Sequence, residues 1–221
     1  MALYIDSAFL DDITRVARTV PLAGVTTNPT ILRTARERGQ RLSPLEVLTA
    51  LLEQVPGSIF MQPGGPDEEE MYQQMLTYIQ VAPERVIPKI PMTVAGIRVA
   101  RRLKQEPCHL SFTAVTTVIQ AYTAALLGAD FIIPYYGRLE NSGIDASKRI
   151  SEIAQVLAKA GLPTRILAAS IKSTQDATRV LCAGAHDLTV APQVLLDMVS
   201  DSLSEEAIAR FDQDWQILNT L

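Results

Sequence analysis

Short apolar segments alternate along this chain with longer segments in which hydrophobic residues recur at every third or fourth position. The short segments are residues 3–5, 23–25, 58–61, 86–87, 109–112, 131–133, 165–168 and 187–189. Most are apolar at consecutive positions, as strands of a parallel sheet are when both faces are buried. Between them, residues such as Ile150, Ile153 and Leu157 have the spacing of one face of an amphipathic helix. The pattern therefore predicts strands that alternate with helices throughout the chain.

Consecutive strand and helix units of this number suit a closed (β/α)8 barrel, the TIM barrel, better than an open sheet. No Gly-x-Gly-x-x-Gly sequence follows the first strand, and no phosphate-binding loop of the Walker type occurs, which argues against a dinucleotide-binding sheet. One helix start is clear, because Ser43, Pro44 and Glu46 supply an N-cap, a first-turn proline and a capping-box acid. We expect one α/β catalytic domain over residues 1–203 and an extra helix over residues 204–221 that packs on a neighbouring subunit.

The composition narrows the classes of partner. The chain has 221 residues, of which 48% are hydrophobic and 20% charged, which suits a single soluble domain. Its net charge of −4 comes without a basic cluster, so neither nucleic acid nor a membrane surface is an expected partner. Cys108 and Cys182 are too few for a disulfide scaffold, and we interpret them as reduced core thiols of a cytoplasmic protein.

Polar side chains stand at or directly after almost every apolar run. In a barrel the carboxyl ends of the strands carry the chemistry, so these positions are the candidates for a site. In chain order the polar residues are Asp6, Thr26, Thr27, Asn28, Gln62, Lys89, Ser111, Thr113, Tyr135, Arg138, Ser170 and Lys172. The only histidines, His109 and His186, belong to no ligand cluster, and we expect neither a metal nor another cofactor.

Lys89 is the most informative of these residues, because it lies between Pro88 and Pro91 in an apolar segment. Enclosure of this kind removes water from the side chain and disfavours the ammonium form. A neutral lysine amine attacks carbonyl carbon, and the resulting iminium accepts electrons from a neighbouring C–C bond. The alternative is a lysine that extends past the barrel mouth into solvent.

Asp6 and Asn28 each have a structural and a chemical interpretation. Asp6 either caps a helix or, placed across the barrel mouth from Lys89, binds a substrate hydroxyl and moves protons. Asn28 precedes Pro29, as in a capped helix start, but its amide also suits the hydroxyls of a polyol.

The residues that follow the sixth and seventh strands suggest an anion site. Arg138, Ser170 and Lys172 lie where many barrels bind phosphate, although they could instead be solvated loop residues. Tyr135 could likewise be a half-buried aromatic whose hydroxyl is merely satisfied.

Taken together, these motifs resemble the fructose-6-phosphate aldolase and short transaldolase family, which are class I aldolases on (β/α)8 barrels. The resemblance extends from end to end. The matching pieces are Leu22-Ala-Gly-Val-Thr-Thr-Asn-Pro-Thr30, Lys89-Ile-Pro-Met-Thr93, Thr113-Ala-Val, Gly128-Ala-Asp, Pro134-Tyr135 with Arg138, Ala168-Ala-Ser-Ile-Lys172 and Phe211-Asp-Gln-Asp-Trp215. The first two are the most specific, because they occur together and in this order on the second and fourth strands.

The resemblance implies roles for the catalytic candidates. Lys89 matches the lysine that forms the Schiff base, and Asp6 matches the aspartate of the first strand. Tyr135 matches a tyrosine that assists proton transfer, while Gln62 and Thr113 match residues that hold the catalytic water.

For the substrate, the resemblance implies that Thr26 and Asn28 contact hydroxyl groups and that Arg138 and Ser170 bind phosphate. Ser111 and Lys172 complete the expected binding set by their positions at strand ends.

Two positions separate aldolases from transaldolases within the resemblance. Transaldolases usually carry glutamate where Gln62 stands and phenylalanine where Tyr135 stands, so both residues favour an aldolase. Three features differ from the expected aldolase pattern: Pro88 before the lysine, the Pro63-Gly64-Gly65 segment after Gln62, and residues 136–141 around Arg138, which resemble transaldolases more than aldolases. Because proline cannot donate a ladder hydrogen bond, Pro88 predicts a fourth strand that ends or bulges early.

The sequence therefore predicts a class I aldolase that cleaves or forms the C3–C4 bond of a ketose phosphate, with fructose 6-phosphate giving dihydroxyacetone and glyceraldehyde 3-phosphate. One alternative is a transaldolase of the pentose phosphate pathway, which transfers the dihydroxyacetone unit to an aldose phosphate. Another is a non-catalytic barrel that binds sugar phosphates. The resemblance implies a homo-oligomer, either a pentamer or a decamer, and leaves the acceptor aldehyde open.

Overall fold

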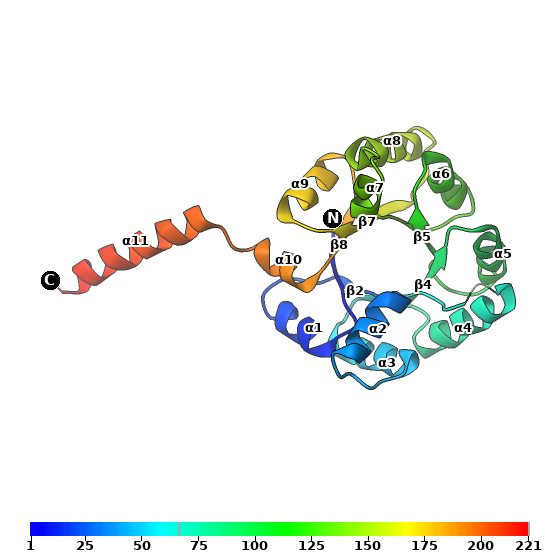
Figure 1. The fold of residues 1–221 in the computed structure, drawn as a ribbon, viewed down its shortest axis with the longest axis horizontal. Helices are drawn as coiled ribbons and strands as arrows, with labels where there is room; N and C mark the ends of the chain where they lie inside the picture. Colours follow the sequence, from blue (N-terminus) through cyan, green and yellow to red (C-terminus); the bar gives the residue numbers. More distant parts are fainter. Residues whose placement is uncertain (66, 221) are drawn as a thin grey trace.

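The computed structural model describes residues 1–65 and 67–220, which form a closed barrel of eight parallel strands (Figure 1). Each strand pairs with the next along the chain, and β8 closes the ring against β1. The strands are β1 Leu3–Asp6, β2 Gly24–Thr26, β3 Ser58–Met61, β4 Val86–Pro91, β5 Ser111–Val115, β6 Phe131–Pro134, β7 Arg165–Ile171 and β8 Asp187–Val190. The predicted TIM barrel is confirmed.

Helices surround the strands as an outer ring (Figure 1). Two of them separate β2 from β3, and two separate β6 from β7. The helices of this ring are α1 Leu10–Ala17, α2 Pro29–Glu37, α3 Pro44–Gln54, α4 Glu68–Val81, α5 Val94–Leu103, α6 Val118–Leu126, α7 Tyr136–Asn141, α8 Ala146–Lys159, α9 Thr174–Cys182 and α10 Pro192–Asp197. The last helix, α11 Ser202–Asn219, lies outside the ring.

Local sequence signals start several of these helices. In the capping box of α3, Ser43 accepts from the backbone N–H of Glu46, and the Glu46 side chain accepts from the backbone N–H of Ser43. The periodic residues of α8 bury their side chains as predicted, with Ile150, Ile153 and Leu157 at most 2% exposed. Hydrophobic spacing therefore determines which face of the helix meets the barrel.

The prediction that the fourth strand ends or bulges at Pro88 is wrong. The strand β4 continues to Pro91, and Pro88 pairs with Met61 of β3. The carbonyl of Pro88 accepts a hydrogen bond from the Ser111 hydroxyl at 2.8 Å, so the proline keeps a polar contact with β5 although it lacks an N–H donor.

The irregular positions lie in β5 and β7 instead. The register shifts between Thr113 and Val115 and again between Ala168 and Ile171. At these points Ala114 and Ser170 have φ values of 58° and 62°, a left-handed conformation that L-residues seldom adopt. Both bulges lie at the carboxyl half of their strands, where a barrel carries its site.

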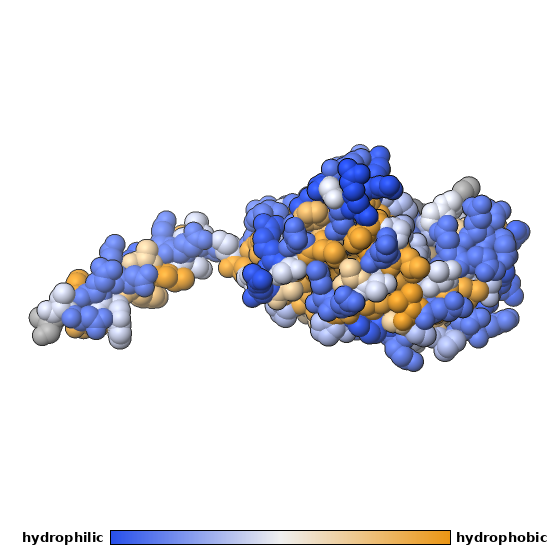
Figure 2. Space-filling view, turned by 90° about the horizontal axis from the view of Figure 1, so that it is seen from below, coloured by the Kyte–Doolittle hydropathy of each residue, from blue (hydrophilic) through white to orange (hydrophobic). Residues whose placement is uncertain are grey.

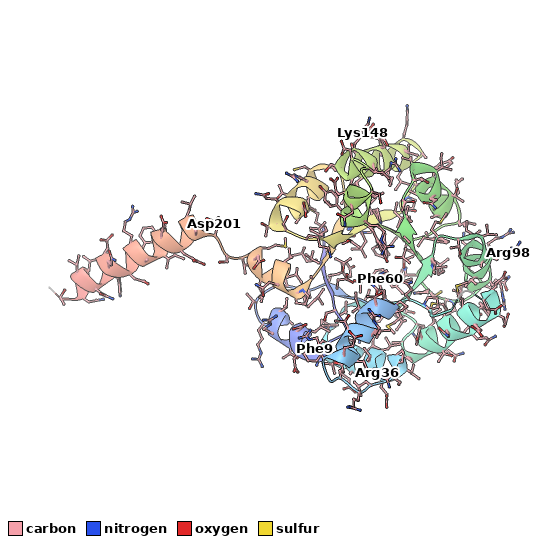
Figure 3. All side chains as sticks on the ribbon, in the orientation of Figure 1. Phe9, Arg36, Phe60, Arg98, Lys148 and Asp201 are labelled. Carbon is pink, nitrogen blue, oxygen red and sulfur yellow. The ribbon has the colours of Figure 1, made fainter. Side chains whose placement is uncertain are left out.

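An apolar layer fills the interior of the barrel beneath that end. Its buried members are Tyr4, Phe60, Ile87, Ile133, Leu167 and Ala169. Phe60 lies inside the ring of strands (Figure 3), where its ring meets those of Tyr4 and Phe131 edge to face, with centroids 5.4 and 5.2 Å apart. Side chains two residues apart on a strand point to the same face. The residue two positions after each member of this layer therefore faces the same interior, closer to the carboxyl end of the barrel.

The two cysteines do not form part of the core. Cys182 is exposed and Cys108 is half-buried, so the interpretation of both as core thiols is wrong. Burial, followed by the nearby Glu106 and Asp130 carboxylates, raises the pKa of Cys108 to about 11. The Cys108 thiol is therefore almost entirely protonated at neutral pH.

The last helix, α11, extends away from the barrel (Figure 1). It begins at Ser202, and Leu221, the last residue of the predicted helix, lies outside the described residues. Ile208, Phe211 and Trp215 are each more than half exposed, and Figure 2 shows hydrophobic surface along this helix. Packing on a neighbouring subunit stays a prediction. Among the described residues, no helix combines the length and the hydropathy needed to cross a lipid bilayer.

Candidate active site

A cavity of about 390 Å³ opens at the carboxyl ends of the strands. It brings together most of the polar residues singled out from the sequence. Among its lining residues are Asp6, Asn28, Gln62, Lys89, Tyr135, Arg138, Ser170 and Lys172. These side chains come from segments spread over most of the chain, and the closed barrel is what places them around one space.

Lys89 lies in the middle of β4 and is only 1% exposed. Its Nζ donates a hydrogen bond to the backbone carbonyl oxygen of Thr27 at 3.1 Å. The same nitrogen lies 5.7 Å from the centroid of the Tyr135 ring. The side chain therefore stays inside the barrel beside the cavity, and the alternative of a lysine that reaches into solvent does not hold.

Asp6 ends β1 and is held from below by a hydroxyl. Thr26, its pairing partner on β2, donates a hydrogen bond from Oγ1 to Asp6 Oδ1 at 2.6 Å. Asp6 is not the cap of the helix that follows, because α1 begins after Phe9. The arrangement engages one carboxylate oxygen and leaves the aspartate on the cavity wall.

Tyr135 and Thr113 form a pair of hydroxyls next to the lysine. The Tyr135 hydroxyl oxygen lies 2.8 Å from Thr113 Oγ1, and either group can be the donor. Thr113 is buried in β5 and Tyr135 is half-buried directly after β6. The pair is suited to pass a proton, because each hydroxyl can both donate and accept.

Gln62 lies on the same cavity in spite of the Pro63-Gly64-Gly65 segment that follows it. The backbone N–H of Gly64 donates to Gln74 Oε1 at 2.9 Å, which ties this segment to α4. Within residues 1–65 and 67–220, Gln62 Oε1 is a buried oxygen without a hydrogen-bond partner. A buried acceptor of this kind is usually satisfied by a water or a ligand.

Asn28 acts as a helix cap and also faces the cavity. Its Oδ1 accepts from the backbone N–H of Ile31 at 2.9 Å, at the start of α2. The cap fixes the orientation of the amide, because Oδ1 must face the helix. The Nδ2 group then remains as the donor for a ligand.

The opposite side of the cavity carries two exposed cations, Arg138 in α7 and Lys172 after β7. In the part of the chain that the structure describes, neither belongs to an ion pair. Ser170, on the β7 bulge, lines the same cavity. A Cβ atom at Gly137 would lie 2.6 Å from the carbonyl oxygen of Ser170, so only glycine allows α7 to approach the bulge this closely.

The structure places three of the expected residues behind the cavity wall. Thr26 is fully buried, with its hydroxyl committed to Asp6. Ser111 is buried, and its hydroxyl donates to the Pro88 carbonyl. Thr113 reaches the cavity only through Tyr135. Their hydroxyls support groups on the wall.

Sequence reasoning missed Thr189 and Ala114, as well as apolar residues of the cavity wall such as Ile31 and Ala169. Thr189 of β8 is fully buried, with its Oγ1 2.5 Å from Thr26 Oγ1. Its signal was available, because it is a polar residue near the end of the last strand. Ala114 lines the cavity through a left-handed backbone. An alanine in the sequence does not predict that conformation.

The chain is similar to known proteins over almost its whole length. The family model described as transaldolase/fructose-6-phosphate aldolase matches residues 3–221. The chain is 33% identical over 220 residues to a probable fructose-6-phosphate aldolase of Streptococcus pneumoniae, covering 99% of this chain and 97% of the relative. It is 34% identical over 216 residues to a probable transaldolase of Symbiobacterium thermophilum, covering 98% and 97%. It is also 33% identical over 216 residues to a probable transaldolase of Alkaliphilus metalliredigens, covering 98% of both.

Solved structures agree on the fold. Two structures of mandelate oxidase variants superpose with a TM-score of 0.62 at 13% and 14% identity. The superposition covers 87% of this chain, which spans 65% and 66% of the mandelate oxidase chains. At this identity the likeness concerns the barrel alone.

Proposed function

Because this chain belongs to the transaldolase/fructose-6-phosphate aldolase family, whose members are enzymes of the Schiff-base type, we propose that Lys89 is its Schiff-base lysine. The reaction is the cleavage or formation of the C3–C4 bond of a ketose phosphate. Fructose 6-phosphate would give dihydroxyacetone and glyceraldehyde 3-phosphate. The observation that carries the proposal is the Lys89 Nζ, buried in the barrel beside a cavity rimmed by hydroxyls, a carboxylate and two cations.

In the first step the Lys89 amine adds to the C2 carbonyl carbon of the ketose. The carbonyl oxygen takes up protons and leaves as water, and a protonated iminium remains on Nζ. Asp6 and the Tyr135 hydroxyl move these protons, because both lie on the cavity that Lys89 faces.

Bond cleavage follows from the electron demand of the iminium. The C4 hydroxyl gives its proton to Asp6, the C3–C4 electrons flow into the iminium, and the aldehyde departs while an enamine stays on Lys89. The Asn28 amide supports this step by donating to a substrate hydroxyl, since its Oδ1 is already bound by the helix start.

Release of the ketone needs a proton on the enamine carbon and a water molecule at C2. The hydroxyl pair of Tyr135 and Thr113 suits the proton transfer, and the unpartnered Gln62 Oε1 suits the water. Hydrolysis then frees dihydroxyacetone and regenerates the amine.

The phosphate end of the substrate fits the side of the cavity that carries Arg138, Ser170 and Lys172. Two cations outside any described ion pair, together with a serine on the same cavity, supply the charge and the hydrogen-bond donors that a phosphate group needs. Among the described residues, no carboxylate forms an ion pair with Arg138 or Lys172 and competes with a phosphate for them. We therefore assign phosphate binding to this trio.

Transaldolase activity is the second candidate, and both activities occur in the names of the relatives. The two reactions share the enamine and differ in whether water or a second aldehyde consumes it. The Tyr135 hydroxyl, held beside Thr113, favours protonation and release and therefore the aldolase.

Borohydride trapping tests the covalent step. The full-length protein is incubated with dihydroxyacetone, reduced with borohydride, digested and examined by mass spectrometry. We expect the adduct on the peptide that contains Lys89 and none on the peptide that contains Lys172, which is the matched control within the same cavity. A protein that gains no adduct at Lys89 would instead be a non-catalytic sugar-phosphate-binding barrel.

Two further proposals concern the protein in the cell. We propose a homo-oligomer in which α11 packs on a neighbouring copy, because Phe211 and Trp215 are exposed on a helix that leaves its own barrel. Sedimentation of the full chain and of a chain truncated before Ser202 tests this, with a smaller assembly expected after truncation. A cytoplasmic location stays a prediction.

A further inference from the structure

Thr189 is a buried polar residue in β8 that none of the steps above uses. Thr189 and Thr26 are both fully excluded from solvent, and their Oγ1 atoms are 2.5 Å apart. Thr26 Oγ1 is in turn 2.6 Å from Asp6 Oδ1. The strands β8 and β2 flank β1 on either side, so the three side chains meet within the barrel just beneath the cavity.

The direction of these hydrogen bonds follows from counting protons. The Thr26 hydroxyl donates to Asp6 Oδ1, because the base required by the proposed cleavage is a carboxylate and a carboxylate can only accept. Thr26 then has only lone pairs to offer to Thr189, which must donate its own proton. The chain of donors runs from Thr189 to Thr26 to Asp6.

We propose that Thr189 is a positioning residue for the proton transfers of Asp6. Its hydroxyl fixes the rotamer and the proton direction of Thr26, and Thr26 holds Oδ1 of Asp6. The other oxygen, Oδ2, is thereby reserved for the substrate. The assignment rests on the proposed function, because Asp6 is the group through which Thr189 acts.

Loss of the Thr189 hydroxyl has a specific consequence. Thr26 is then free to rotate or to leave a lone pair unsatisfied in a dry interior, and Asp6 loses a donor of fixed orientation. Thr189 is not among the residues that line the cavity, so substrate contacts stay as they are. The change should therefore appear in kcat and not in KM.

Two substitutions at this position separate positioning from packing. Thr189→Val keeps the volume and removes the hydroxyl, whereas Thr189→Ser keeps the hydroxyl and removes a methyl group. If Thr189 only fills space, Val is the better replacement. If Thr189 directs a proton, Ser is the better one.

The experiment measures ketose-phosphate cleavage by the full-length protein. We expect Thr189→Val to lower kcat about tenfold, with KM within about twofold, and Thr189→Ser to stay within about threefold of the unsubstituted enzyme. In an Asp6→Asn background the effect of Thr189→Val should disappear, because the chain no longer ends on a carboxylate. Thr164→Val is the matched control, since it removes another buried threonine hydroxyl, one that precedes β7 and donates to the Ala129 carbonyl outside the cavity, and it should leave kcat unchanged.

If Thr189→Val does not fold, Thr189→Cys preserves the volume with a much weaker donor and should lower kcat in the same way. A Val variant that turns over as fast as the unsubstituted enzyme, or a Ser variant slower than the Val variant, overturns the assignment alone. An unsubstituted protein that is not trapped at Lys89 overturns the proposed function and the assignment with it.

Discussion

The hydroxyl oxygen of Tyr135 lies 2.8 Å from Thr113 Oγ1, which joins the end of β6 to β5 next to Lys89, whose Nζ lies 5.7 Å from the Tyr135 ring centroid. Tyr135 faces the cavity and Thr113 lies behind it, so the threonine fixes the phenol by a hydrogen bond. In the reaction we propose, the pair would connect the enamine to a proton source, so its loss should slow the release of dihydroxyacetone more than its transfer to an aldehyde.

Tyr135→Phe should slow the release of dihydroxyacetone about a hundredfold, because the enamine loses its general acid. Transfer of the same unit to an added acceptor aldehyde should fall much less, since that step protonates an alkoxide and not the enamine carbon. Product analysis with and without erythrose 4-phosphate measures both rates. Equal losses in the two rates would exclude a specific role for the phenol in release.

Arg138→Ala should raise the KM for glyceraldehyde 3-phosphate about tenfold to a hundredfold in the synthetic direction, because a charge-assisted contact to phosphate is lost. The KM for unphosphorylated glyceraldehyde should stay the same. Arg138→Lys is the control, which keeps the charge but not the planar donor pair, and should lie between the two. A similar change for both aldehydes would place Arg138 outside the phosphate site.

Gly137→Ala tests the close approach of α7 to the β7 bulge. The new Cβ would lie 2.6 Å from the Ser170 carbonyl oxygen, so backbone must move apart. We expect a loss of about 1–3 kcal/mol in the free energy of unfolding, as for other overpacked sites, together with weaker binding of phosphorylated substrates. Asn141→Ala, at an exposed position of the same helix, is the control for chemical denaturation. Unchanged stability and KM would show that this contact is not tight.

His186 gives the stability a dependence on pH. Burial, and then the positive charge of Arg165, lower the pKa of His186 below its ordinary value, and its Nδ1 accepts from the Ile166 N–H at 2.9 Å. The unfolded chain therefore binds a proton more readily than the folded one. Above the ordinary histidine pKa of about 6.5, His186 does not make the free energy of unfolding depend on pH. Below that value the free energy of unfolding falls as the pH drops toward the pKa of the folded state.

Denaturant midpoints at a series of pH values measure this effect. His186→Gln can keep an acceptor for the Ile166 N–H. In this variant the denaturant midpoint should fall less steeply as the pH drops below about 6.5. His109→Gln is the control, because His109 lies at an exposed surface pair with Asp130. An unchanged slope in the His186 variant would contradict the assignment.

The barrel and most of the site could be predicted from the sequence because both depend on strand periodicity. Side chains alternate along a strand, so the polar residues two positions after Tyr4, Phe60, Ile87 and Ile133 had to face the same interior. Lys89, Asp6, Gln62 and Tyr135 are those residues, and they share the cavity.

The remainder depends on backbone geometry that residue types do not encode. The left-handed conformations of Ala114 and Ser170 cannot be recognised from their residue types. Pro88 stays within a paired strand, and its contact with the Ser111 side chain of β5 uses its carbonyl and needs no N–H donor. Thr26 and Ser111 are buried behind the cavity wall because of where their strands end. The hydrophobic pattern predicts the end of a strand only to within a few residues.

We propose above all that Lys89 carries a covalent aldol cleavage that ends in free dihydroxyacetone. The most direct measurement is the rate at which dihydroxyacetone appears from fructose 6-phosphate with no other aldehyde present, for the unsubstituted enzyme and for Lys89→Met, which retains an unbranched side chain in the buried site. We predict steady release by the unsubstituted enzyme and none above background by the variant. Equal release by both proteins would contradict the role of Lys89, and release only after an acceptor aldehyde is added would contradict aldolase activity.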